Sequence, residues 1–293
     1  MTTQPGEASV EPTVEADSQH FLVRPYPWAA GVSDKGLSHP KNQDFLAIAA
    51  GHDAQDRPFA VVAVSDGVST SAHSAQAATI AARESAASLS QTLCDAQSAP
   101  GDAQRQMRTA FRCANEAVLA ASGTGHPGSW ACTLVVASWW HGRVVVGSVG
   151  DSRCYWFPDQ GQARLLSTDD SLAQARIELG VARQVAESGA QAHAILKWLG
   201  PGCGECEPTL QTLRPSGDGW LIVCSDGLWN YASAADDLGA VVAELQASMH
   251  DPTPPACALA QGLADWANAQ GGRDNVTVAA VRVTTPPAGP VLA

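Results

Sequence analysis

The chain has 293 residues, is 45% hydrophobic and 16% charged, and carries a formal net charge of −12 at pH 7. This negative charge, with no cluster of Lys and Arg, excludes a general nucleic-acid-binding protein, which presents a basic surface to phosphates. No apolar stretch of about 18 residues occurs, so no membrane-spanning helix is expected. The polar, acidic N-terminus does not resemble a secretory signal. We therefore expect a cytoplasmic protein with neither nucleic acid nor membrane among its partners.

The chain is expected to form one domain over residues 25–284, between a disordered tail at 1–24 and a flexible tail at 285–293. The first tail has low hydrophobicity and a Glu, Pro, Ser and Thr bias. The second contains three prolines, which cannot extend a sheet. No linker long enough to divide the chain lies between the two tails.

Apolar runs of strand length and helical patterns occur in separate blocks along the chain. Strands are expected at 28–33, 44–50, 59–65, 132–140, 143–150, 152–157, 163–167, 220–225 and 275–283. Helices are expected at about 72–94, 102–121, 234–249 and 255–269. The pair His141-Gly142 is interpreted as a hairpin turn. One face of the second helix is apolar at helical spacing, through Met107, Phe111, Ala114 and Val118.

Strands in blocks and helices in pairs are typical of α+β folds with antiparallel sheets, not of alternating βαβ folds. Strands that are apolar on both faces, such as those at 59–65 and 220–225, indicate burial on both sides. The sequence therefore predicts a four-layer α-β-β-α sandwich, in which two antiparallel sheets are flanked by helix pairs.

Acidic residues recur where the predicted strands begin or end. The triplet Ser-Asp-Gly follows two apolar strands, at 65–67 and at 225–227. The acids in such positions are Asp44, Asp66, Asp151, Asp226 and Asp274. Because strand ends of one sandwich can converge on a single rim, we expect these side chains to form one cluster. Asp-Gly also marks ordinary turns, so position alone does not name a reaction.

Clustered carboxylates repel at neutral pH, and proton uptake or divalent cations relieve the repulsion. Oxygen ligands without His or Cys suit Mg²⁺ or Mn²⁺. Two such ions about 3.5–4 Å apart can share an ionised water and hold a phosphoryl group during in-line displacement.

Six segments, in this order, resemble the metal-dependent serine/threonine protein phosphatases of the PPM class, type 2C, in their bacterial form. They are SDKGLSHPKNQD (33–44), AVSDG (63–67), VGSVGDSRCYWF (146–157), LSTDDS (166–171), GDGWLIVCSDGLWNY (217–231) and GGRDNVTVAAV (271–281). The resemblance extends from about residue 31 to 283. It implies hydrolysis of phosphoserine and phosphothreonine by attack of a metal-bridging water, with two Mn²⁺ or Mg²⁺ ions and a third bound weakly.

The resemblance also implies roles for individual residues. The metal ligands would be Asp44, Asp66, Gly67, Asp151, Asp226 and Asp274, of which Asp66 bridges both metals and Gly67 contributes its carbonyl. Asp44 would act near the second metal through water, and Asp151 would join Asp226 around the third. The catalytic set would be Asp66, Asp226, Asp274 and His39. Asn275 is expected to orient Asp274 by hydrogen bonding.

The chain departs from the family pattern at several positions. His39 stands five residues after Asp34, where family members have a phosphate-binding Arg, and His lacks the bidentate guanidinium fork. Lys41 is the alternative phosphate ligand, and a plain loop role for His39 stays open. Gln43 replaces the acid often found before Asp44, which weakens ligation of the second metal from there.

Two further segments lie beside the expected site. The Ser and Thr residues after Gly67 are expected to cap the helix near 72, with His73 as a less favoured proton donor. The segment at 170–198 resembles the flap beside the site, and its sequence does not disclose the substrate.

Cys203 and Cys206 have the spacing of a metal knuckle, but no second pair follows to complete a structural zinc site. We interpret them as incidental loop cysteines, with zinc or redox chemistry as alternatives.

The predicted function is that of a monomeric protein phosphatase acting on phosphorylated proteins and reversing a bacterial Ser/Thr kinase. The alternative is a pseudophosphatase that binds phosphoproteins as a regulatory module. His39 and Gln43 slightly favour the alternative, and the intact acids oppose it. A metal nuclease is disfavoured by the negative charge.

Overall fold

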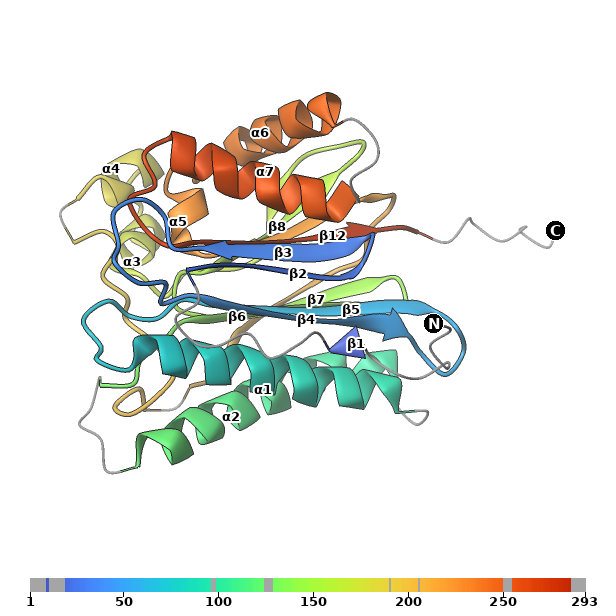
Figure 1. The fold of residues 1–293 in the computed structure, drawn as a ribbon, viewed down its shortest axis with the longest axis horizontal. Helices are drawn as coiled ribbons and strands as arrows, with labels where there is room; N and C mark the ends of the chain where they lie inside the picture. The colour runs from blue at the N-terminus through green and yellow to red at the C-terminus, as the bar shows by residue number, and fades with distance from the viewer. Residues whose placement is uncertain are drawn as a thin grey trace.

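The computed structural model describes residues 9–10, 19–95, 99–123, 129–189, 191–204, 206–249 and 255–285. Two antiparallel six-stranded sheets stack face to face (Figure 1). The first has the order β1 (Ser9–Val10), β4 (Phe45–His52), β5 (Pro58–Ser65), β6 (Leu134–Trp140), β7 (Arg143–Val149) and β10 (Thr209–Leu213). The second has the order β2 (His20–Tyr26), β3 (Ala29–Asp34), β12 (Val276–Val283), β11 (Gly219–Cys224), β8 (Arg153–Pro158) and β9 (Arg164–Leu165).

A pair of helices covers the outer face of each sheet (Figure 1). These are α1 (Ser74–Cys94) and α2 (Ala103–Ser122) on the first sheet, and α6 (Ala235–Ser248) and α7 (Pro255–Ala269) on the second. A short 3₁₀ turn, η1 (Pro100–Asp102), leads into α2. The predicted α-β-β-α sandwich is confirmed. No helix of the described residues is long and apolar enough to cross a bilayer.

The strands are apolar on both faces because each sheet is covered twice. Along β11, Leu221 and Val223 pack into the core shared by the two sheets, α1 and α2. Trp220, Ile222 and Cys224 alternate with them and belong to the core beneath α6 and α7. Alternation across a strand thus produces two cores from one continuous apolar run.

Two local predictions are confirmed. The apolar face of α2 is buried, since Met107, Phe111, Ala114 and Val118 are each at most 1% exposed. His141 and Gly142 connect β6 to β7 with φ of 51° and 63°. Two consecutive residues with positive φ form the kind of tight turn that matches the twist of a hairpin.

The predicted N-terminal tail over 1–24 is too long. His20–Tyr26 form β2, which pairs with β3 and buries Phe21 and Val23, and Ser9–Val10 pair with β4. The alternation of inward and outward side chains in β2 is that of a half-covered strand at a sheet edge. Residues 1–8, 11–18 and 286–293, which make up most of the two predicted tails, lie outside the described residues.

Six strands and α-helices were not predicted. They are β1, β2, β10, and, at one end of the sandwich (the left end in Figure 1), the flap helices α3 (Leu172–Glu178) and α4 (Arg183–Glu187) with the short helix α5 (Asp226–Trp229) beside them. The flap helices together bury only a few alanines, such as Ala173 and Ala186. So little burial leaves a weak apolar period in the sequence.

Candidate active site

Sheet register brings the predicted acids to one rim of the sandwich. In the first sheet the start of β4 lies opposite the end of β5, through the pair Phe45 and Ser65. In the second sheet Cys224, at the end of β11, pairs with Arg153 at the start of β8 and with Val278 near the start of β12. The loops at these strand ends carry Asp44, Asp66, Asp151, Asp226 and Asp274. We call these five side chains the acid rim.

Two glycines allow the acid-bearing loops to approach one another. A Cβ on Gly67 would lie 2.6 Å from the carbonyl oxygen of Gln43, the residue before Asp44. A Cβ on Gly227 would lie 2.0 Å from the carbonyl oxygen of Asn275, the residue after Asp274. Both distances are far inside van der Waals contact. Glycine after Asp66 and after Asp226 therefore places each of these acids beside a second one.

The acid rim has a buried floor and a more open mouth. Asp44 and Asp151 are 5% and 4% exposed, whereas Asp66, Asp226 and Asp274 are partly exposed. Removal from water, together with the charges of Asp274 and Asp226, raises the pKa of Asp44 to about 8, although the nearby hydroxyls of Ser225 and Thr277 oppose the rise.

The same two causes raise the pKa values of three other acids of the rim. Removal from water, followed by the charge of Asp274, raises the pKa of Asp226 to about 7. The pKa of Asp66 is raised well above its ordinary value by removal from water and then by the charges of Asp44 and Asp226. Removal from water and the charge of Asp226 also raise the pKa of Asp151. The pKa of each of these four carboxyl groups is thus raised by the charge of at least one other acid of the rim, as expected of one cluster.

Several oxygens of the acid rim lack a hydrogen-bond donor. Both carboxyl oxygens of Asp44 and one of Asp226 are buried and unpartnered within the described part of the chain. Buried oxygens without donors, all from carboxylates, suit a hard divalent cation. No three His, Cys, Asp or Glu side chains of the described residues already surround a common point.

Hydroxyl groups fix the backbone under the acid rim. Thr133 Oγ1 accepts from the backbone N–H of Asp66 at 3.0 Å and lies 2.7 Å from Ser152 Oγ. Ser225 Oγ accepts from the N–H of Thr277 at 3.0 Å. These bonds join the loops of both sheets, so the acid rim is held as one unit.

Asn275 forms a hydrogen bond to Asp274, as predicted, but through its backbone rather than its side chain. The backbone N–H of Asn275 donates to Asp274 Oδ1 at 2.8 Å. Its side-chain amide instead donates to the carbonyl oxygens of Lys35 at 2.8 Å and Lys41 at 3.0 Å, and accepts from the N–H of Gln43 at 2.8 Å. Asn275 therefore pins both ends of the loop that carries His39.

His39 lies at the mouth of the acid rim, with Nε2 at 3.3 Å from Asp274 Oδ1. The Lys41 backbone is on the same pinned loop. The side-chain amide of Gln43 donates to Ser74 Oγ. The loop therefore presents one imidazole beside a predicted metal ligand.

The predicted hydroxyl cap of the helix near 72 is wrong. The N-cap of α1 is His73, and no side chain caps the helix there. Ser71 Oγ accepts from the N–H of Ala131 instead, and the His73 ring stacks on Trp130 at 4.9 Å. The hydroxyls of this segment are thus used to hold neighbouring loops.

A buried arginine beside the acid rim was not predicted. Arg153 is 1% exposed and forms a bidentate pair with Asp169, with bonds of 3.0 and 2.6 Å. Its guanidinium lies 3.6 Å from the centre of the Trp229 ring, and Trp229 Nε1 donates to the carbonyl oxygen of Asp151 at 2.9 Å. Arg153 also reaches Glu187 of α4 at 3.3 Å. It therefore ties the flap to the acid rim.

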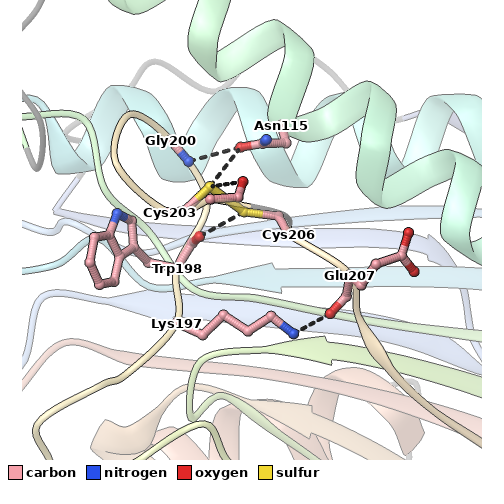
Figure 2. The surroundings of a disulfide bond; sticks show 8 residues. Asn115, Lys197, Trp198, Gly200, Cys203, Cys206 and Glu207 are labelled. Atoms are coloured by element: carbon pink, nitrogen blue, oxygen red, sulfur yellow. Dashed lines mark hydrogen bonds between the residues drawn. A yellow bond between two sulfur atoms is a disulfide. The ribbon is translucent and has the colours of Figure 1, made fainter.

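Cys203 and Cys206 form a disulfide, so their interpretation as incidental loop cysteines is wrong (Figure 2). Their Cα atoms are 6.4 Å apart. The bond closes the loop that follows Leu199. Leu199 exchanges backbone hydrogen bonds with Cys132, and Cys132 forms a β-bridge with Gly67. Asn115 of α2 accepts from the N–H of Gly200 at 2.9 Å. The bonded loop is thus connected by backbone to the acid rim.

A cavity of about 300 Å³ opens beside Asp274. We call it the flap pocket; its lining residues are Glu187, His193, Gly227, Trp229, Asn230, Tyr231, Ser233, Arg273 and Asp274. The pocket joins the flap to the acid rim and was not predicted from the sequence.

The stacked sheets and the acid rim define the class of the chain, which is that of the protein serine/threonine phosphatases. Residues 37–266 match the family model described as protein phosphatase 2C, and the chain belongs to this family. No curated protein sequence matches the chain.

Three solved structures illustrate the similarity. The serine/threonine phosphatase PstP/Ppp of Mycobacterium tuberculosis is 25% identical, with a TM-score of 0.68 over 90% of this chain and 99% of that one. MsPP of Mycobacterium smegmatis, a PPM Ser-Thr phosphatase in complex with cacodylate, is 26% identical, with a TM-score of 0.64 over 86% and 97%. The catalytic domain of PstP in complex with two manganese ions is 25% identical, with a TM-score of 0.64 over 90% and 99%.

Gly227→Ala should lower the free energy of unfolding by about 3 kcal/mol or more, because the new methyl group meets the Asn275 carbonyl and a packed backbone must shift. Gly217→Ala is the matched control, since a Cβ there meets no atom within 4 Å, and it should stay within about 0.5 kcal/mol of wild type. Urea unfolding of both variants measures the difference. Equal stability of the two would contradict the close approach.

Without divalent cations, the free energy of unfolding should fall as pH rises from about 5 to about 8. In the folded protein the pKa of Asp44 is about 8 and that of Asp226 is about 7, whereas both have the ordinary pKa of 3.8 in the unfolded chain. Over this pH range the folded acid rim therefore keeps protons that the unfolded chain has released. Mn²⁺ should reverse the loss above pH 8. Thermal unfolding across this range, with chelator or with Mn²⁺, measures both effects, and Asp44→Asn should flatten the chelator profile. A chelated protein that gains stability over this range would contradict the raised pKa values.

Proposed function

We propose that this protein hydrolyses phosphoserine and phosphothreonine in other proteins with the help of two divalent cations, Mn²⁺ or Mg²⁺, and so reverses a bacterial Ser/Thr kinase. The observation that carries the proposal is the acid rim: five acids at one end of the sandwich, four of which have raised pKa values and two of which have unpartnered oxygens. The two manganese ions bound by PstP support the same type of ion here. A cytoplasmic, monomeric enzyme stays a prediction from the sequence.

The residues fit the two ions as follows. Asp66, Asp226 and Asp274, at the open mouth, would hold them where a substrate can reach, and the Gly67 carbonyl would add a backbone ligand. Asp44 and Asp151, on the buried floor, would act from below, Asp151 around a weaker third ion. Such ions, when bound, neutralise the phosphoryl oxygens and acidify the attacking water.

His39 would bind the substrate phosphate from the mouth of the acid rim. Its Nε2 is 3.3 Å from Asp274 Oδ1, so a phosphoryl group beside Asp274 lies within its reach. Asn275 holds the His39 loop at both ends, which fixes the imidazole relative to the acids. One imidazole donates fewer hydrogen bonds than a guanidinium fork, so phosphate binding would be weaker than with Arg.

The intact acids disfavour the pseudophosphatase alternative. A protein that only binds phosphoproteins has no need for buried carboxyl groups that repel one another, because unpaired buried acids cost stability.

Asp226→Ala should reduce Mn²⁺-dependent hydrolysis of p-nitrophenyl phosphate by at least about a hundredfold. It should also leave the chelated protein as stable as wild type or more so, because one repelling charge is removed. Steady-state assays and thermal unfolding measure the two effects. Asp237→Ala, at an exposed acid on α6, is the control and should behave as wild type. Unchanged turnover in Asp226→Ala would overturn the proposed site.

His39→Arg should lower the KM for phosphopeptides by about three- to tenfold, because a guanidinium donates two parallel hydrogen bonds to a phosphoryl group. The kcat should stay the same, since the acids are unchanged. Lys41→Arg, on the same loop, tests the alternative phosphate ligand and should leave the KM unchanged. Complete loss of hydrolysis in His39→Arg would show that His39 does something other than bind phosphate.

A further inference from the structure

We propose that the flap pocket selects phosphoproteins with an anionic side chain close to the phosphorylated residue, and that Arg273 is the residue that recognises it. The anion can be a carboxylate or a second phosphoryl group, which share the same chemistry. This inference rests on the proposed function, because it assumes that the substrate phosphate sits over the acid rim.

The position of the pocket makes it a subsite for the substrate chain. Asp274 belongs both to the acid rim and to the pocket wall, and Arg273 is the residue before it. Neighbouring residues of an extended peptide are about 3.3–3.6 Å apart along the chain. A phosphoserine held at Asp274 therefore places a residue next to it in sequence at the entrance of the pocket, whose 300 Å³ can hold a long side chain.

The charge of Glu187, an acid in the pocket wall, is already balanced by neighbouring arginines. Glu187 Oε1 lies 2.7 Å from Arg183 and 3.3 Å from Arg153, and its Oε2 accepts from Ser233 Oγ at 2.6 Å. Its side chain is only 17% exposed. Arg183 and Arg153 are in turn occupied by Glu187 and Asp169. Glu187 therefore offers little attraction to a basic side chain of the substrate.

Arg273 is the pocket's available cation. Arg273 is exposed. Its backbone N–H donates to the Tyr231 hydroxyl at 2.9 Å, which fixes the position of the Arg273 backbone at the pocket wall. Within the described part of the chain, its guanidinium has no acid partner. The other basic side chain of the wall, His193, packs against the Trp229 ring at 5.8 Å. A guanidinium free to form a fork binds a carboxylate or phosphoryl group through two hydrogen bonds.

The charge of the whole protein makes this recognition selective. With a net charge of −12, the surface repels acidic peptides in general. An acidic side chain of the substrate therefore strengthens binding only where it meets a local cation. Charge complementarity at one position changes the choice between substrates more than the overall affinity. The preference should therefore depend on where the anion stands relative to the phosphoserine.

The test compares phosphoserine peptides that differ at a single flanking position, which carries Glu, Gln, Lys or a second phosphoserine in turn. For the wild-type protein with Mn²⁺, kcat/KM should be about fivefold higher with the anion than with Gln at the preferred position. Arg273→Glu should invert the order in favour of Lys, and Arg273→Lys should keep it. Because each ratio compares two peptides on one protein, a general loss of activity cancels.

Arg112→Glu is the matched control, since it makes the same charge change at an exposed site on α2, and its ratios should equal those of wild type. The Glu and second-phosphoserine peptides show which anion is preferred, and either supports the proposal. Equal rates with Glu, Gln and Lys at every position, or an unchanged order in Arg273→Glu, would overturn it.

Failure of the proposed function is recognised separately, by absence of Mn²⁺-dependent hydrolysis of every peptide and of p-nitrophenyl phosphate. In that case fluorescence anisotropy of the same labelled peptides, with Mn²⁺ present, measures the same ratios as binding constants. A preference for the anion that Arg273→Glu inverts would then still support the pocket assignment, and its absence would reject it.

Discussion

The rest of the site depends on one constraint: the two sheets hold five acidic side chains close together, where their negative charges repel one another. The strands that carry them are fixed by register and by apolar burial on both faces, so the acids cannot separate without breaking both cores. Removal from water, followed by the charges of neighbouring acids, raises the pKa values of Asp44, Asp66, Asp151 and Asp226. Protons or divalent cations must balance the cluster, and a site that demands cations is suited to phosphoryl transfer.

Three contacts turn this cluster into an organised site. Thr133 and Ser152 join the acid-bearing loops from below. Asn275 holds the loop that carries His39, and Arg153 connects the flap helix α4 with the Trp229 ring and Asp169. Most of these bonds end on backbone atoms or on buried partners, so they keep the loops at fixed positions around the acids. The Arg153 connection reaches the flap pocket, because its partners Glu187 and Trp229 line the pocket wall.

Much of this arrangement could be predicted from the sequence, because long apolar strands and the helical period of α2 follow from burial alone. The five acids could also be predicted, since each stands at a strand end. The edge strand β2 and the flap helices could not, because they bury few residues and leave weak periodicity. The partners of Asn275 and Arg153, and the Cys203–Cys206 bond, depend on which distant loops meet, and spacing along the chain does not determine that.

The close packing at Gly67 and Gly227 has a consequence for how this chain can diverge. Neither residue has a side chain, yet each occupies a point where two main chains nearly touch. Random drift can exchange many surface side chains without harm, whereas one added carbon atom at either point would push the loops apart. Such a protein could become inactive with all of its reactive groups still in place.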